Sequence, residues 1–98
     1  MMTQEVTFVK REMRYDPTQG KQVPIEEVLE TMWINVTDVG LERKAKLYGN
    51  VKRAKKELHF MPFILPPEDY THIIIDGREW QEVTRIGVRR VTIVVEEV

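Results

Sequence analysis

Two histidines, His59 and His72, carry the side chains of this sequence that are best suited to acid–base or metal chemistry near neutral pH. They fall on separate predicted strands, and neither belongs to an H-x-x-x-H or H-E-x-x-H spacing, which would place two imidazoles on one metal. The acidic pairs at 26–27, 68–69 and 96–97 consist of adjacent residues. Adjacent residues of a strand point to opposite faces, so these carboxylates are not expected to share a proton as a catalytic dyad. The sequence therefore predicts no metal site and no acid–base pair.

The chain contains neither cysteine nor serine, so two common covalent nucleophiles are missing. Its five glycines stand singly and form no loop that would cradle a phosphate. We therefore predict that the protein is not an enzyme and uses no cofactor. The lack of cysteine also suits synthesis in a reducing cytosol.

A basic segment at residues 43–56 is the most pronounced charge feature, although the whole chain has a net charge of only −1. Its seven cations, with no acid among them, are Arg43, Lys44, Lys46, Lys52, Arg53, Lys55 and Lys56. Such a cluster could neutralise the phosphates of nucleic acid, but Tyr48 is the single aromatic residue interleaved with the cations. We prefer docking on an acidic protein surface, with nucleic-acid binding and a merely solvated face as the alternatives.

The first half of the chain predicts a hairpin followed by a helix. Residues 6–9 favour a short strand, residues 15–20 a turn, and residues 22–36 a returning extended stretch in which 26–30 are ambiguous between strand and helix. Leu41, Ala45 and Tyr48 recur at helical spacing. They predict one short helix between a cap at Thr37 or Asp38 and an end at residues 49–50.

The second half predicts strands almost throughout. A strand is expected from about Arg53, followed by turns at Pro62 and at Pro66-Pro67. Residues 70–75 and 78–86 flank an Asp76-Gly77 pair, which is typical of a type I′ hairpin, and residues 88–95 add a third strand. We predict a single all-β domain over residues 1–98, a small barrel or sandwich of five to six mostly antiparallel strands with one short helix in a middle connection.

An apolar stretch at residues 61–67 contains three prolines, which prevent it from continuing as a central strand. Phe63 and Leu65 therefore lie on a connection. We expect either that they fold back as a plug over one end of the core, or that they form an exposed patch that meets a partner.

Two groups of residues form a distinctive pattern. The central group is Asn35-Val36-Thr37-Asp38-Val39-Gly40, Glu42-Arg43 and Ala45-Lys46-Leu47-Tyr48-Gly49. The C-terminal group is Asp69-Tyr70, Ile73, Ile75-Asp76-Gly77-Arg78, Trp80 and Val83. Together they resemble the small head-tail connector proteins of phages and of prophages in Gram-positive bacteria, which are described as head-closure, head-tail adaptor or minor capsid proteins.

The resemblance implies a structural virion protein, synthesised in the cytoplasm of the bacterial host, that forms a homo-oligomeric ring beneath the portal. Its partners would be portal or adaptor proteins and tail proteins, with contact to packaged DNA as a further option, and no catalytic residue or cofactor is implied. We also predict no membrane partner, because no apolar run approaches the ~18 residues that a span needs. The alternatives are a small OB-like protein that binds single-stranded nucleic acid through residues 43–56, and an enzyme subunit or inhibitor.

Overall fold

The computed structural model describes residues 2–39, 54–87 and 89–98, and these residues form six β-strands. The strands are β1 (Met2–Asp16), β2 (Lys21–Asp38), β3 (Lys55–His59), β4 (His72–Ile75), β5 (Arg78–Ile86) and β6 (Thr92–Glu97). The all-β prediction is thus confirmed for the described ranges, in which no helix is long and apolar enough to cross a membrane. The helix predicted between Leu41 and Tyr48 lies outside the described residues, but the cap predicted at Thr37 or Asp38 is wrong, because both residues belong to β2 and pair with β3.

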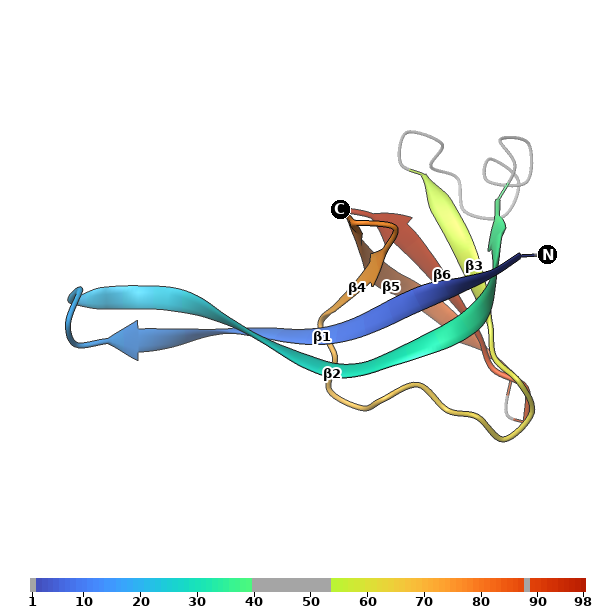
Figure 1. The fold of residues 1–98 in the computed structure, drawn as a ribbon, viewed down its shortest axis with the longest axis horizontal. Coiled ribbons are helices and arrows are strands. Elements are labelled where there is room, and N and C mark those ends of the chain that lie inside the picture. The colour runs from blue at the N-terminus through green and yellow to red at the C-terminus, as the bar shows by residue number, and fades with distance from the viewer. Residues whose placement is uncertain (1, 40–53, 88) are drawn as a thin grey trace.

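The strands pair in the order β1-β2-β3-β6-β5-β4, and β4 returns to β1, so that the sheet closes into a barrel (Figure 1). All six pairings are antiparallel. The chain makes two three-stranded meanders, β1-β2-β3 and β4-β5-β6, which are joined by the β3–β6 and β1–β4 pairings. The predicted meander at the C-terminus is therefore present, and the closed pairing corresponds to the barrel among the two predicted architectures.

Alternate strand residues fill the barrel interior, as the pleat of a strand requires. Phe8 is fully buried, and its ring centroid lies 5.1 Å from that of Tyr70 and 6.2 Å from that of Phe60. The buried cluster consists of Val6, Phe8, Ile34, Val36, Leu58, Phe60, Ile73, Ile75, Trp80, Val91, Ile93 and Val95. Burial of each large apolar side chain contributes roughly 1.5–3 kcal/mol, so this cluster is the main force that holds the sheet closed.

Two tight connections follow from the residues that occupy them. Asp76 and Gly77, between β4 and β5, both have positive φ, at 52° and 75°, as a type I′ turn requires. Gly87, between β5 and β6, has a φ of 93°, and a Cβ atom at this position would lie 2.2 Å from the Arg90 carbonyl oxygen. The Asp-Gly hairpin is therefore confirmed. In the β5–β6 connection, position 87 has room for glycine alone.

The first hairpin is longer than the sequence predicted. Its turn falls where expected, with the Gly20 N–H donating to the Asp16 carbonyl oxygen at 2.8 Å. However, β1 extends over 15 residues where a short strand at 6–9 was predicted, and the ambiguous residues 26–30 belong to β2, which has 18 residues. The prediction was wrong about length because it relied on apolar residues, and much of this hairpin lacks an apolar face.

Replacing Gly87 by alanine should destabilise the domain by about 2 kcal/mol or more, because a strained φ is combined with a clash against backbone. Gly20→Ala is the matched control, since Gly20 also has positive φ but nothing lies within 4 Å of its Cβ position; we expect a cost of about 1 kcal/mol there. Urea unfolding of both variants measures the two costs. A cost at Gly87 no larger than that at Gly20 would contradict the close approach.

Candidate interaction surfaces

The hairpin of β1 and β2 continues beyond the barrel as a two-stranded ribbon, residues 10–27, here called the arm (Figure 1). Strand β4 pairs with β1 at Val6–Val9, and β3 pairs with β2 at Asn35–Asp38. Within the described part of the chain, residues 10–16 and 21–27 therefore have ladder partners only in each other. The protrusion is visible in the dimensions of the molecule, 49 × 32 × 23 Å.

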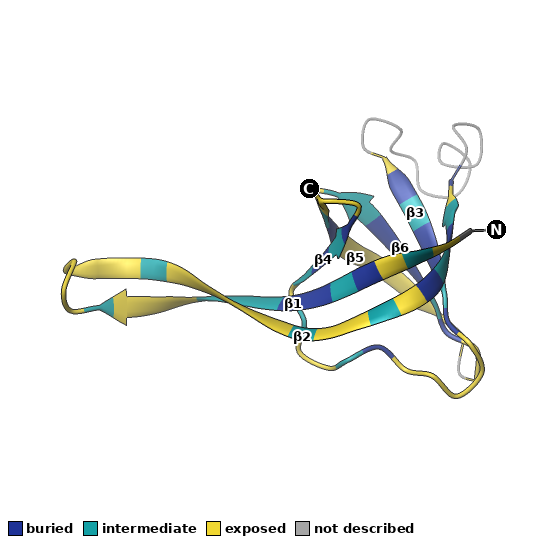
Figure 2. Cartoon of the chain, in the orientation of Figure 1, coloured by how far each residue is buried: buried dark blue, intermediate teal, exposed yellow. Residues whose placement is uncertain are grey.

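The arm begins at a β-bulge and exposes apolar side chains. The register shifts between Phe8 and Val9, which pair with Glu30 and Val28, so Leu29 is the extra residue. Bulges bend a strand pair and redirect it. Beyond this point Met13 and Tyr15 are 56% and 64% exposed, and most of the arm is coloured as exposed in Figure 2. Because an isolated two-stranded ribbon is marginally stable in water and has open edges, the arm is suited to contact another molecule.

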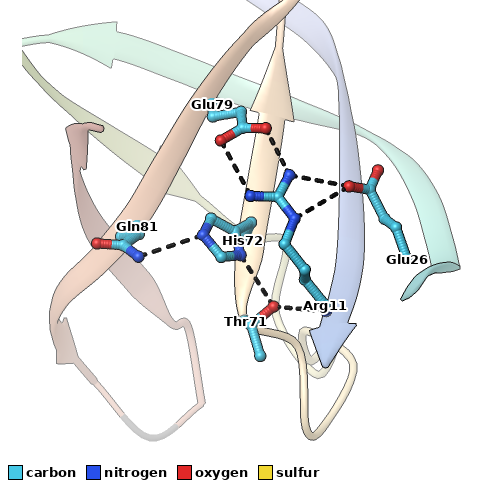
Figure 3. Close-up of polar contacts among 6 residues, drawn as sticks. All are labelled: Arg11, Glu26, Thr71, His72, Glu79 and Gln81. Carbon is cyan, nitrogen blue, oxygen red and sulfur yellow. Dashed lines mark hydrogen bonds and ion pairs between the residues drawn. The ribbon is translucent and has the colours of Figure 1, made fainter. Parts of the chain in front are cut away.

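One arginine fastens the base of the arm to the barrel (Figure 3). The Arg11 guanidinium donates from Nη2 and Nε to Glu26 Oε2 at 2.8 and 3.2 Å, and from Nη1 to Glu79 Oε2 at 3.3 Å. Glu26 lies on β2 and Glu79 on β5, so the planar fork spans three strands. The hydrogen bonds from Arg11 also lower the pKa of Glu79 below its usual value.

Two further hydrogen bonds act at the same point. The Arg11 backbone N–H donates to Thr71 Oγ1 at 2.7 Å, and the Thr71 N–H donates to the Val9 carbonyl oxygen at 2.9 Å. They continue the contact between β1 and the chain that enters β4, just beyond their last strand pair at Val9 and His72. The base of the arm is thus fixed in direction, although its outer part is bonded only across the hairpin.

The connection at residues 61–65, here called the rim, forms a second exposed apolar surface. Phe63 is 80% exposed and Leu65 is 62% exposed, so the prediction of a plug over the core is wrong and the alternative of an exposed patch fits. The Phe63 N–H donates to the Arg89 carbonyl oxygen at 3.0 Å, which sets the rim against the β5–β6 connection. Met61 and Ile64 share a shallow hollow of about 290 Å³ with Trp33 of β2.

Phe63 combines a strained backbone with an exposed ring. Its φ of 65° lies in the left-handed region, which is uncommon for a bulky residue and costs of order 1–3 kcal/mol. Two backbone hydrogen bonds stabilise this conformation. One joins Phe63 to Arg89, and in the other the Ile64 N–H donates to the Met61 carbonyl oxygen at 3.1 Å. The rim is therefore a defined structure and not a collapsed cover.

The basic segment is only partly within the described residues. Lys55 and Lys56 are described, whereas the other five predicted cations, Arg43, Lys44, Lys46, Lys52 and Arg53, are not. The Lys55 side chain is 3% exposed, and its Nζ lies 2.7 Å from Glu96 Oε2. Lys56 pairs with Asp38, and its Nζ lies 5.4 Å from the centroid of the Trp80 ring.

These contacts correct part of the predicted docking surface. Lys55 was predicted to belong to a basic docking surface, but Glu96 is its direct partner on β6 and covers it. Lys56 points to the side of the core residue Leu58, where it contacts Trp80. Both lysines therefore stabilise the barrel, and Lys55 has little surface left to present to a partner.

The two histidines hold strands together. His59 Nε2 is hydrogen bonded to Thr37 Oγ1 at 2.9 Å and its Nδ1 to Thr92 Oγ1 at 3.4 Å, which links β2, β3 and β6. His72 is hydrogen bonded to Thr71 Oγ1 at 2.9 Å and to Gln81 Nε2 at 3.3 Å. In residues 2–39, 54–87 and 89–98, no group of three His, Asp or Glu side chains is arranged to hold a metal.

Sequence reasoning did not identify the arm. Arg11, Met13 and Tyr15 were not singled out, because residues 10–16 have the mixed composition of a solvated segment.

Comparisons with known proteins leave the family open. No protein-family model matches this chain, and the search of curated proteins found no match.

Charge reversal of Lys55 should unfold or strongly destabilise the domain. Lys55→Glu would place a buried carboxylate at the position now paired with Glu96, and disruption of a buried pair costs about 3–5 kcal/mol. Lys21→Glu, at the exposed end of the arm, should change the unfolding free energy by no more than ~0.5 kcal/mol. Thermal melts compare the two, and equal melting temperatures would show that Lys55 is solvated.

The Arg11 contact should contribute stability at neutral pH that is lost in acid. The folded-state pKa of Glu79 is lowered from its usual 4.5, so the contribution is complete above pH 4.5 and declines as pH falls through the lower, folded-state pKa. The unfolding free energies of the native protein and of Arg11→Met should therefore differ at pH 7 and converge on acidification. Arg14→Met is the control, because Arg14 pairs with Glu12 on the arm itself. A difference that is independent of pH would argue against the Arg11–Glu79 contact.

Proposed function

We propose that the chain is a structural subunit of a phage head-tail connector, which forms a ring beneath the portal and joins the DNA-filled head to the tail. The observation that carries the proposal is the arm, a β-ribbon held at its base and otherwise exposed on both faces. An isolated two-stranded ribbon adds little stability to a solitary domain, but it can serve as a contact surface in an assembly. The exposed apolar rim adds a second contact surface.

The resemblance to head-tail connectors supports the same proposal through fold-determining residues. Tyr70 packs on Phe8, Ile73 and Trp80 belong to the core, and Asp76-Gly77 forms the β4–β5 turn. Substitutions at these positions would disturb the barrel itself and not an exposed contact surface. They therefore favour a shared architecture, while the contact surfaces of this chain are argued from its own arm and rim.

The partners in this proposal are portal or adaptor proteins on one side, tail proteins on the other, and further copies of the chain in the ring. The place of action is the virion, after synthesis in the bacterial cytoplasm. No step of bond making or breaking is assigned to the chain.

Loss of the gene from its phage should leave filled or emptied heads and separate tails, which electron microscopy of lysates would show. Complementation by the native gene should restore joined particles.

A double variant, Phe63→Asn with Leu65→Ser, should fold with an unfolding free energy within ~1 kcal/mol of the native value, because both side chains are exposed and Asn tolerates positive φ. We expect this variant to fail in complementation.

Joined, infectious particles without the gene would overturn the proposed function. A salt-dependent mobility shift of short single-stranded oligonucleotides by the purified protein, together with normal particle assembly, would favour the nucleic-acid-binding alternative.

A further inference from the structure

We propose that the arm of one copy docks on the rim of the next copy, so that the ring is built from arm-to-rim contacts. This inference deepens the proposed function, because ring formation is part of that function, and it names the surfaces that make the contact. It rests on the composition of two exposed regions at different places in one chain.

Strand β2 exposes apolar and acidic side chains at residues 25–30, where the arm joins the barrel; Ile25 and Glu27 lie on one face of the strand and Val28 on the other, as its pleat requires. Val28, at the base of the arm, is 63% exposed, and Ile25 is 36% exposed. Glu27 and Glu30 are exposed between and beside them. Neither carboxylate has an ion pair or hydrogen bond with another residue of the described part of the chain, in contrast to Glu26, which binds Arg11.

The rim and the connection beside it are apolar and basic. The most exposed apolar side chains of the rim are Phe63, Met61 and Leu65, in this order. Arg89 and Arg90, on the β5–β6 connection to which the Phe63 N–H is hydrogen bonded, are both exposed. Their guanidinium groups form no ion pair within the ranges that the structure describes.

The two regions therefore match in kind, apolar with apolar and carboxylate with guanidinium, which is the pattern of complementary protein surfaces. The arm extends away from the barrel (Figure 1). Within the part of the copy that the structure describes, Glu27 and Glu30 form no ion pair with Arg89 or Arg90. The natural partner for each surface is then a second copy of this chain. A contact between two different surfaces of identical subunits is heterologous, and it closes into a ring when the rotation between copies permits.

The open edges of the arm add a directional component. Residues 10–16 and 21–27 each carry backbone groups that are not engaged in the ladder of the hairpin, and such edges pair readily with extended chain. The rim lies between β3 and β4 and turns at Pro62 and Phe63, and Ile64 and Leu65 after this turn belong to no strand of the barrel. Main-chain hydrogen bonds can therefore accompany the side-chain contacts when the arm lies along the rim.

The chain has no cysteine, so two single-cysteine variants allow a direct test. Val28→Cys places the thiol at the base of the arm and Leu65→Cys places it on the rim, both at exposed positions. The two are mixed, with a mass tag on one, at a total concentration of about 0.5 mM, so that weak contacts are populated. They are then treated with a short bismaleimide. We expect arm–rim dimers to exceed arm–arm and rim–rim dimers severalfold in the mass spectrum.

Charge exchange provides the matched control. Arg89→Glu with Arg90→Glu should lower the arm–rim yield about tenfold or more, because two interfacial ion pairs become repulsive. Adding Glu27→Arg and Glu30→Arg to the same chain should restore the yield, while these two changes alone should also lower it. If the variants that change only the arginines or only the glutamates lowered the yield by disturbing the fold, combining them would not restore the yield.

An arm–rim yield no higher than about twice that of each like dimer, which is the result of random pairing of equal amounts, would overturn the arm-to-rim contact, and so would a yield that the charge changes leave unaltered. Absence of any dimer above the level of a free-thiol control protein would do the same. These results are independent of the particle test: failed cross-linking with unjoined heads in the gene deletion refutes this contact alone, and efficient cross-linking with normal particles in the deletion refutes the proposed function alone.

Discussion

Closure of the barrel is the constraint on which the other features depend. Four of its strands have between four and nine residues. The closed sheet uses only short segments of the first hairpin, Val6–Val9 of β1 against β4 and Asn35–Asp38 of β2 against β3. At roughly 3.3 Å per residue, however, a strand as long as β1 extends about 50 Å. The excess cannot be accommodated in the barrel wall, so the bulge at Phe8/Val9 redirects it outward as the arm.

The barrel and the two exposed surfaces, arm and rim, differ in what they contribute to stability. The barrel owes its stability to the buried cluster around Phe8, and the two surfaces contribute little to it because their apolar side chains stay in water. The arm is held by Arg11 and Thr71 at its base, and the rim by the hydrogen bond from Phe63 to Arg89. Both are therefore oriented before any partner arrives, which lowers the ordering cost of binding. A small domain with such preformed surfaces is suited to a role in assembly.

Much of the barrel was predictable from the sequence, whereas the contact surfaces were not. The Asp76-Gly77 hairpin and the C-terminal meander follow from turn chemistry and alternation, which are local properties. The burial of Lys55 depends on Glu96, which is far away in the chain and adjacent only after β3 and β6 pair. Likewise, the charges of residues 10–16 look like those of any solvated segment, and it is their position beyond the β4 pairing that makes them an arm. The helix predicted at 41–48 lies outside the described residues, so it stays a prediction.

The central claim is that the arm is an exposed ribbon that becomes supported when another molecule covers it. Hydrogen exchange of the backbone amides measures this directly, because protection reports the local free energy of opening. In dilute protein, amides of residues 12–15, 22, 23 and 25 should exchange far faster than those of the barrel at 34–36, and their protection should rise selectively as the protein is concentrated into assemblies. Arm amides protected to the same degree as the barrel at every concentration would contradict the account.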